Sequence, residues 1–135
     1  MSGGTWRTLL SVMLIAHGVG RVLLLAPCLG LKQWGQSAQF WLLTGRLGDG
    51  TTRALGAVLW LAVIAGFAAS GVGLLGQRPW WRAAAVGAAV ASLVALTVFA
   101  SGTETQPLVS AAAMDVVVLV ALLWIRWPTT ELVGA

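Results

Sequence analysis

Charged residues are scarce in this chain. Lys, Arg, Asp and Glu together make up 9% of its 135 residues, whereas hydrophobic residues make up 59%. A soluble domain carries about 25% charged residues, so the deficit excludes an ordinary soluble protein with a buried core. Together with a mean hydropathy of +0.90, it predicts a membrane-embedded chain.

Cysteine and histidine occur once each, as Cys28 and His17. A single cysteine excludes an internal disulfide, a CxxC redox pair and a cysteine-rich metal or iron–sulfur site. A single histidine leaves no HxxxH or HExxH motif and no second ligand for a bis-histidine haem. We therefore predict no metal site, and no cofactor is evident from the chain's own residues.

Basic runs are also missing, although the net charge is +4 and the pI is about 11.3. The eight Lys and Arg residues are scattered singly, and most of them stand at the ends of apolar segments. No stripe of basic and aromatic residues is present for stacking bases, so nucleic acid is not expected as a partner. Basic residues in these positions indicate membrane topology and contact with lipid head groups.

Four apolar segments are long enough to cross a membrane: 8–26, 54–75, 83–100 and 107–125. A hydrocarbon core about 30 Å thick needs roughly 20 apolar residues in a helix. We predict an all-α membrane protein, a bundle of four transmembrane helices that forms one integral membrane domain over residues 1–135. Pro27 is expected to stop the first helix.

An even number of spans places both termini on the same side of the membrane. That side would hold four arginines, whereas the other side would hold Lys32, Arg46 and Arg53. This small excess, with the amino terminus, favours termini in the cytoplasm.

The first loop, residues 27–53, is long for so small a protein. Its middle, residues 33–43, mixes glutamine and serine with tryptophan, phenylalanine and leucine. This composition predicts a short amphipathic helix that lies in the membrane interface.

Three ionisable residues interrupt the apolar segments: His17, Arg21 and Asp115. A charge in hydrocarbon costs at least roughly 2.5–3.5 kcal/mol, so such residues pair, line a cavity or do chemistry. His17 and Arg21 are four apart and share one helix face. With a rise of about 1.5 Å per residue, Arg21 lies roughly 9 Å and Asp115 roughly 12 Å below the same membrane surface. We therefore predict an Arg21–Asp115 ion pair, with His17 one turn deeper.

Two interpretations of these residues stay open at this stage. The pair could simply lock two helices in register, or Arg21 could reach the head-group region by extending along its helix. Alternatively, the three residues line a pocket that binds a quinone head group, a lipid or another small polar-headed ligand. His17 is then the plausible proton carrier near neutral pH. Glu104 and Gln106, in the third loop, would form the rim of that pocket.

Small residues recur at four-residue spacing in two of the predicted helices. They are Ala62, Gly66 and Ser70 in the second helix, and Ala83, Gly87 and Ala91 in the third. Such rows let helix backbones approach closely within lipid. They indicate packing inside the bundle or a seam for another subunit.

The order of these elements resembles the DoxX-like group of small four-span bacterial membrane proteins. The residues that carry the resemblance are the first-helix stretch 16–21, the second-helix stretch 55–60, the pair Trp80-Trp81 and the last-helix stretch 113–115. The resemblance implies a helical bundle in a bacterial plasma (inner) membrane, with the polar residues of the first helix and Asp115 as the site. Some members of that group are associated with thiosulfate oxidation to quinone or with redox-stress complexes.

The sequence alone favours an accessory subunit or scaffold of a larger energy-converting or redox complex in the membrane. Its partners would be lipids and other membrane subunits, or a second copy of the chain. The alternative is a DoxX-like redox component that binds quinone or lipid through His17, Arg21 and Asp115. The sequence leaves enzymatic activity open but favours its absence, because the chain itself contains no catalytic constellation.

Overall fold

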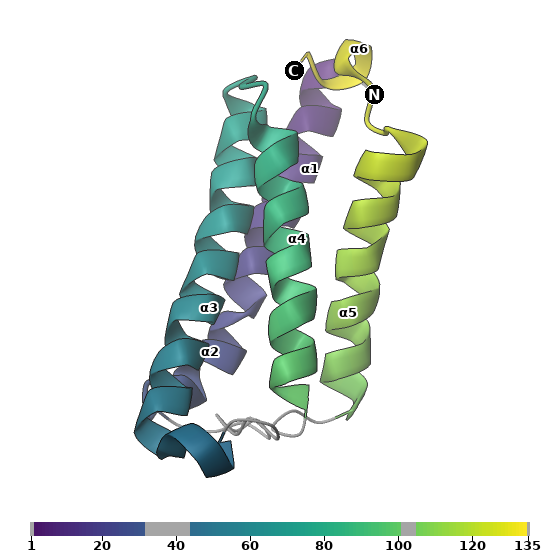
Figure 1. Cartoon of the computed structure of the whole chain (residues 1–135). Helices are drawn as coiled ribbons and strands as arrows, with labels where there is room; N and C mark the ends of the chain where they lie inside the picture. The colour runs from purple at the N-terminus through teal and green to yellow at the C-terminus, as the bar shows by residue number, and fades with distance from the viewer. Residues whose placement is uncertain (1, 32–43, 101–104, 135) are drawn as a thin grey trace.

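The computed structural model describes residues 2–31, 44–100 and 105–134 (Figure 1). All regular elements in this part of the chain are helices, arranged side by side as a bundle. They are α1 (Gly3–Gly20), α2 (Val22–Cys28), α3 (Thr44–Leu75), α4 (Trp81–Val98), α5 (Thr105–Leu119), the π-helical turn η2 (Val120–Ile125) and α6 (Thr130–Val133).

Four helical segments are long and apolar enough to cross a membrane: Gly3–Cys28, Thr44–Leu75, Trp81–Val98 and Thr105–Ile125. They correspond one by one to the four predicted segments. The predicted all-α bundle is therefore confirmed, and the chain has the form of an integral membrane protein. The interfacial helix predicted over residues 33–43 lies outside the described residues.

The ends of the first span differ from the prediction. The helix begins at Gly3, where the hydroxyl of Ser2 accepts a hydrogen bond from the Thr5 N–H. It does not stop before Pro27, because α2 continues through that residue to Cys28. Proline near the end of a helix removes a single N–H donor, so the last turn survives it.

The other spans also start before the apolar segments that predicted them. The second was expected to start at residue 54, but α3 starts at Thr44, with a non-helical break at Gly48. The third runs over Trp81–Val98 rather than 83–100. The fourth starts at Thr105 and ends in the π-helical turn η2. Hydropathy marks the part of a helix that lies in lipid, whereas the helix itself continues into the polar interface.

Glycines bring α3 close to both of its neighbours. A Cβ at Gly71 would lie 2.5 Å from Cγ1 of Ile15 and 2.8 Å from the backbone oxygen of Ser11 on α1. A Cβ at Gly66 would lie 2.9 Å from that of Ala88 on α4. Close backbone approach increases van der Waals contact, which holds helices together in lipid. α3 therefore packs against α1 and α4, and α5 packs mainly against α4.

The two rows of small residues do not both face the inside of the bundle, as a simple packing interpretation requires. On α3, Gly66 and Ser70 do face the bundle, and Ser70 is fully buried. On α4, Ala83 and Gly87 are exposed, and a Cβ at Gly87 would meet nothing within 4 Å. The interior face of α4 consists of other small residues: Ala85, Ala88, Ala89, Ser92 and Ala95.

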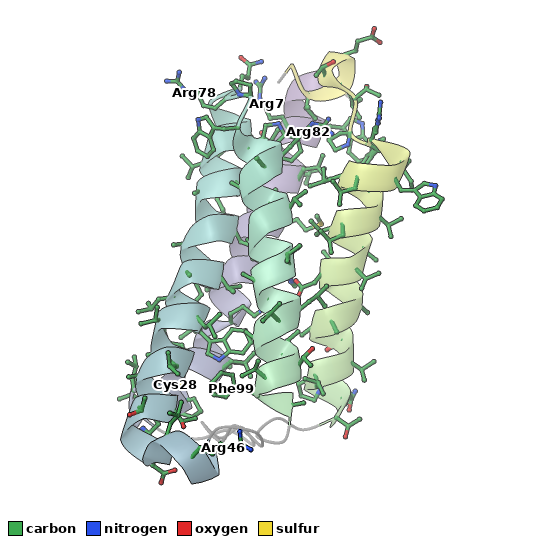
Figure 2. The ribbon with its side chains drawn as sticks, in the orientation of Figure 1. Arg7, Cys28, Arg46, Arg78, Arg82 and Phe99 are labelled. Carbon is green, nitrogen blue, oxygen red and sulfur yellow. The ribbon has the colours of Figure 1, made fainter. Side chains whose placement is uncertain are left out.

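Both termini lie at the same end of the bundle, as the even number of spans predicts (Figure 1). There α6 is tied to α1, since Nη1 of Arg7 donates to the backbone oxygen of Val133 over 3.3 Å. Figure 2 shows Arg7, Arg78 and Arg82 at this end, with Arg46 at the opposite end.

Candidate functional site

Asp115 is fully buried on α5 and forms the centre of a polar cluster. Nη2 of Arg21 donates to its Oδ2 over 2.8 Å, and the Arg21 side chain is only 4% exposed. The predicted Arg21–Asp115 ion pair is thereby confirmed. Arg21 reaches across to α5 rather than extending to the head-group region.

His17 belongs to the same cluster. Its Nε2 lies 2.7 Å from Oδ1 of Asp115, while Arg21 bonds the other carboxylate oxygen. The sequence placed His17 one turn deeper than the ion pair needs. One turn of separation does not keep His17 from Asp115, because the two oxygens of one carboxylate accept from two successive turns of the first span. The ring of His17 also packs edge-on against Phe67 of α3, with centroids 4.8 Å apart.

Ser92 on α4 completes the cluster, and its role was not predicted from the sequence. Its Oγ donates to Oδ2 of Asp115 over 2.5 Å. A serine inside an apolar helix was the available signal. Such serines often bond a carbonyl of their own helix instead, as Ser70 does with the oxygen of Phe67. Spacing along one helix therefore could not assign Ser92 to Asp115.

The hydrogen atoms of the cluster can be assigned from its distances. A carboxylate only accepts, so Nε2 of His17 carries the proton that it shares with Asp115. Nη2 of Arg21 lies 3.1 Å from the same nitrogen, but its hydrogens have better partners in Asp115 and in the backbone oxygen of Ala111 at 3.3 Å. Nδ1 of His17 has no hydrogen-bond partner within the described part of the chain.

The charges of the cluster balance. The charges of the Arg21 guanidinium and the Asp115 carboxylate cancel, so the ion pair carries no net charge. Three donors from two other helices satisfy the buried carboxylate. A buried ion pair is tolerated when its geometry is good and its remaining polar atoms are bonded. One atom is an exception, because the buried Nε of Arg21 has no partner among the described residues.

A cavity of about 290 Å³ lies beside the cluster, between α1 and α5. We call it the polar cavity. Its lining residues are Ala16, His17, Gly20, Arg21, Pro107, Ser110, Ala111 and Met114. Gln106, predicted at the rim, is exposed and does not line it. Glu104, the other predicted rim residue, lies outside the described residues.

Glycine keeps part of this cavity open. Gly20 lines it, and a Cβ at this position would meet nothing within 4 Å. The arrangement can therefore admit a small group next to His17. His17 lines this space, and its Nδ1 has no hydrogen-bond partner among the described residues.

Comparison of the chain with protein-family models, with curated proteins and with solved structures found no match. The resemblance to the DoxX-like group therefore stays an expectation from sequence.

Proposed function

We propose that this chain binds a small, lipid-soluble ligand with a polar head, such as a quinone or a lipid, in the polar cavity. The observation that carries the proposal is the open space beside His17. An ion pair that only holds two helices in register needs Arg21 and Asp115, and it needs no cavity. Here the carboxylate also orients an imidazole whose second nitrogen has no partner in the described chain.

The position of the cavity supports a ligand that arrives through lipid. Its walls come from α1 and the first half of α5, two spans that face one another across it. Binding sites in helical bundles commonly lie between helices, with a few polar groups on an apolar wall. Polar residues inside the membrane are functional candidates by default, because they are costly to retain.

The role that follows is reversible binding, with His17 able to exchange a proton with the bound group. Asp115 orients the imidazole through its bond to Nε2. In a redox complex, such a component would hold the quinone, and a partner subunit would supply the electrons.

Filling the cavity tests this proposal. Gly20→Phe places a ring in the open space without removing any atom of the cluster. Gly87→Phe is the matched control, since it also projects into open space but from the exposed side of α4. After purification in mild detergent, native mass spectrometry should find a bound small molecule on the wild type and on Gly87→Phe. Gly20→Phe should lose it. Equal retention by all three, or no bound molecule on any, would contradict the proposal.

A second candidate function is an accessory subunit that packs against a larger membrane complex. Only 11% of the most apolar window of the α5–η2 span is buried, against 33–39% for the other three spans. The exposed Ala83 and Gly87 add a surface of small side chains on α4. Both features suit contact with another transmembrane helix as well as with lipid.

A photoreactive residue distinguishes contact with a protein subunit from contact with lipid at this surface. Placed at Val116, on the exposed side of α5, it should cross-link to a defined protein in native membranes if the chain is a subunit. The same residue at Val12 on α1 serves as the comparison. Cross-links to lipid alone at Val116 would argue against the accessory function.

We further propose a bacterial plasma membrane location with both termini in the cytoplasm, in keeping with the DoxX-like resemblance. The arginines at the termini end of the bundle support this orientation. In a Cys28→Ser background, Ser2→Cys should resist a membrane-impermeant maleimide added to intact cells, whereas Asp49→Cys should react. The reverse labelling pattern would overturn the orientation.

A further inference from the structure

A second cavity lies beyond the polar cavity, toward the termini end of the bundle. It measures about 360 Å³, and no polar surface lines it. We call it the apolar cavity. Leu10, Met13 and Leu14 of α1 line one side, and Val118 of α5 and Ala121 of η2 line the other. Trp6, Trp127 and Pro128 lie at its termini end.

The two cavities meet at Met114. This residue of α5 lines both of them, and it directly precedes Asp115 in the chain. Methionine is flexible and adapts its shape to a neighbouring group. The space between α1 and α5 therefore offers a polar compartment on one side of Met114 and a fully apolar one on the other. An amphiphile likewise has a polar head that is followed by an apolar chain.

The charge of the cluster restricts the head group of such a ligand. Of the described residues that line the polar cavity, only His17 and Arg21 are ionisable, and the charge of Arg21 is already balanced by Asp115. A phosphate or carboxylate head group would find no unpaired positive charge in this cavity. The polar cavity therefore favours an uncharged head.

The free hydrogen-bonding atoms restrict the head group further. In the neutral imidazole with its proton on Nε2, Nδ1 of His17 has a lone pair and bonds a donor. A hydroxyl provides such a donor, whereas a carbonyl or an ether oxygen cannot serve Nδ1, so a quinone would bind here through a hydroxyl of its reduced form.

We propose that the site takes an uncharged amphiphile with a hydroxyl head. The hydroxyl donates to Nδ1 of His17 in the polar cavity, and the apolar chain passes Met114 into the apolar cavity. This inference rests on the proposed ligand-binding function and specifies its ligand class. The shared chemistry is a hydroxyl on an apolar chain, whether the hydroxyl is an alcohol or a phenol.

Photolabelling of the full chain in lipid nanodiscs tests the ligand class. The probes are a long-chain primary alcohol and an alkylphenol, each with a photoreactive diazirine at the end of its chain. The methyl ether and the carboxylic acid of the same alkyl chain are the comparisons. The alcohol, the phenol or both should label saturably, and labelled peptides should map to residues of the apolar cavity. The ether and the acid should bind about tenfold more weakly, because each loses one hydrogen bond or adds an unpaired charge.

Variants test the binding of the ligand's alkyl chain separately from the binding of its head group. Ala121→Phe fills the apolar cavity at a distance from the cluster, so it should abolish saturable labelling in that cavity. Ala65→Phe, at an exposed position of α3, is the matched control and should label as the wild type does. Labelling unchanged by Ala121→Phe, or equal labelling by alcohol, ether and acid, would overturn the inference.

The two proposals can fail separately. If Gly20→Phe removes the native bound molecule but the long-chain probes never label the apolar cavity, the ligand site stands and the amphiphile inference is overturned. If no variant changes the retention of any small molecule, and no probe labels saturably, the ligand site itself is refuted.

Discussion

Ser92 on α4 and Asp115 on α5 are joined by a hydrogen bond of 2.5 Å in the bundle interior. The same carboxylate accepts from Arg21 and His17 of the first span. Asp115 thus connects three of the four membrane spans through one side chain. α5 packs its backbone mainly against α4, so the cluster is its polar link to α1.

Removing Asp115 should destabilise the protein strongly. Asp115→Ala leaves the guanidinium of Arg21 buried without its counter-charge, and breaking a buried pair in this way costs about 3–5 kcal/mol. Denaturant titration in detergent micelles measures the loss in free energy of unfolding. Asp49→Ala, at an exposed position, is the control and should leave stability unchanged. A small loss for Asp115→Ala would show that the cluster contributes little.

Replacing both charged partners should restore much of that stability. In Arg21→Met with Asp115→Leu, no buried charge is left unpaired, and apolar replacement of a buried pair is often neutral or stabilising. The double variant should therefore unfold at higher denaturant concentration than either single variant. The exchange of Arg21→Asp with Asp115→Arg should recover less, because Ser92 and His17 would then face arginine donors. Equal instability of the single variants and the apolar double variant would contradict the pairing.

Ser92→Ala tests the third donor. A hydrogen bond to a charged group contributes roughly 1.5–3 kcal/mol, and the unfolding free energy should fall by about that amount. Ser70→Ala is a close control, because Ser70 is equally buried but its hydroxyl bonds a carbonyl of its own helix. The Ser70 variant should lose clearly less stability. Equal losses would assign Ser92 no special role.

Gly71→Ala should separate α1 from α3. The added methyl group would overlap with Ile15 and with the backbone of Ser11, and overpacking of this kind costs typically 1–3 kcal/mol. Gly87→Ala adds the same methyl group in open space and should leave thermal stability unchanged or slightly raised. Thermal unfolding of both variants in one detergent makes the comparison. A stable Gly71→Ala protein would show that the two helices can move apart without loss.

Depth along each helix could be predicted from the sequence, and it identified Arg21 and Asp115 as partners. The same counting placed His17 one turn deeper but missed its contact with Asp115, because it treated the carboxylate as a single point rather than two acceptors. It also could not decide which face of α4 turns inward. The row that contains Ala83 and Gly87 looked suitable for packing, yet the interior face is the one that carries Ala88 and Ser92.

The sequence by itself determined the lipid environment, the number of spans, the shared side of the termini and the Arg21–Asp115 ion pair. These follow from hydropathy and from a constant rise per residue, which are properties of one helix at a time. Only the tertiary structure brought Ser92 and His17 to the same carboxylate and left two cavities that meet at Met114. Those features depend on the rotation of each helix about its axis, and side-chain packing between helices sets that rotation.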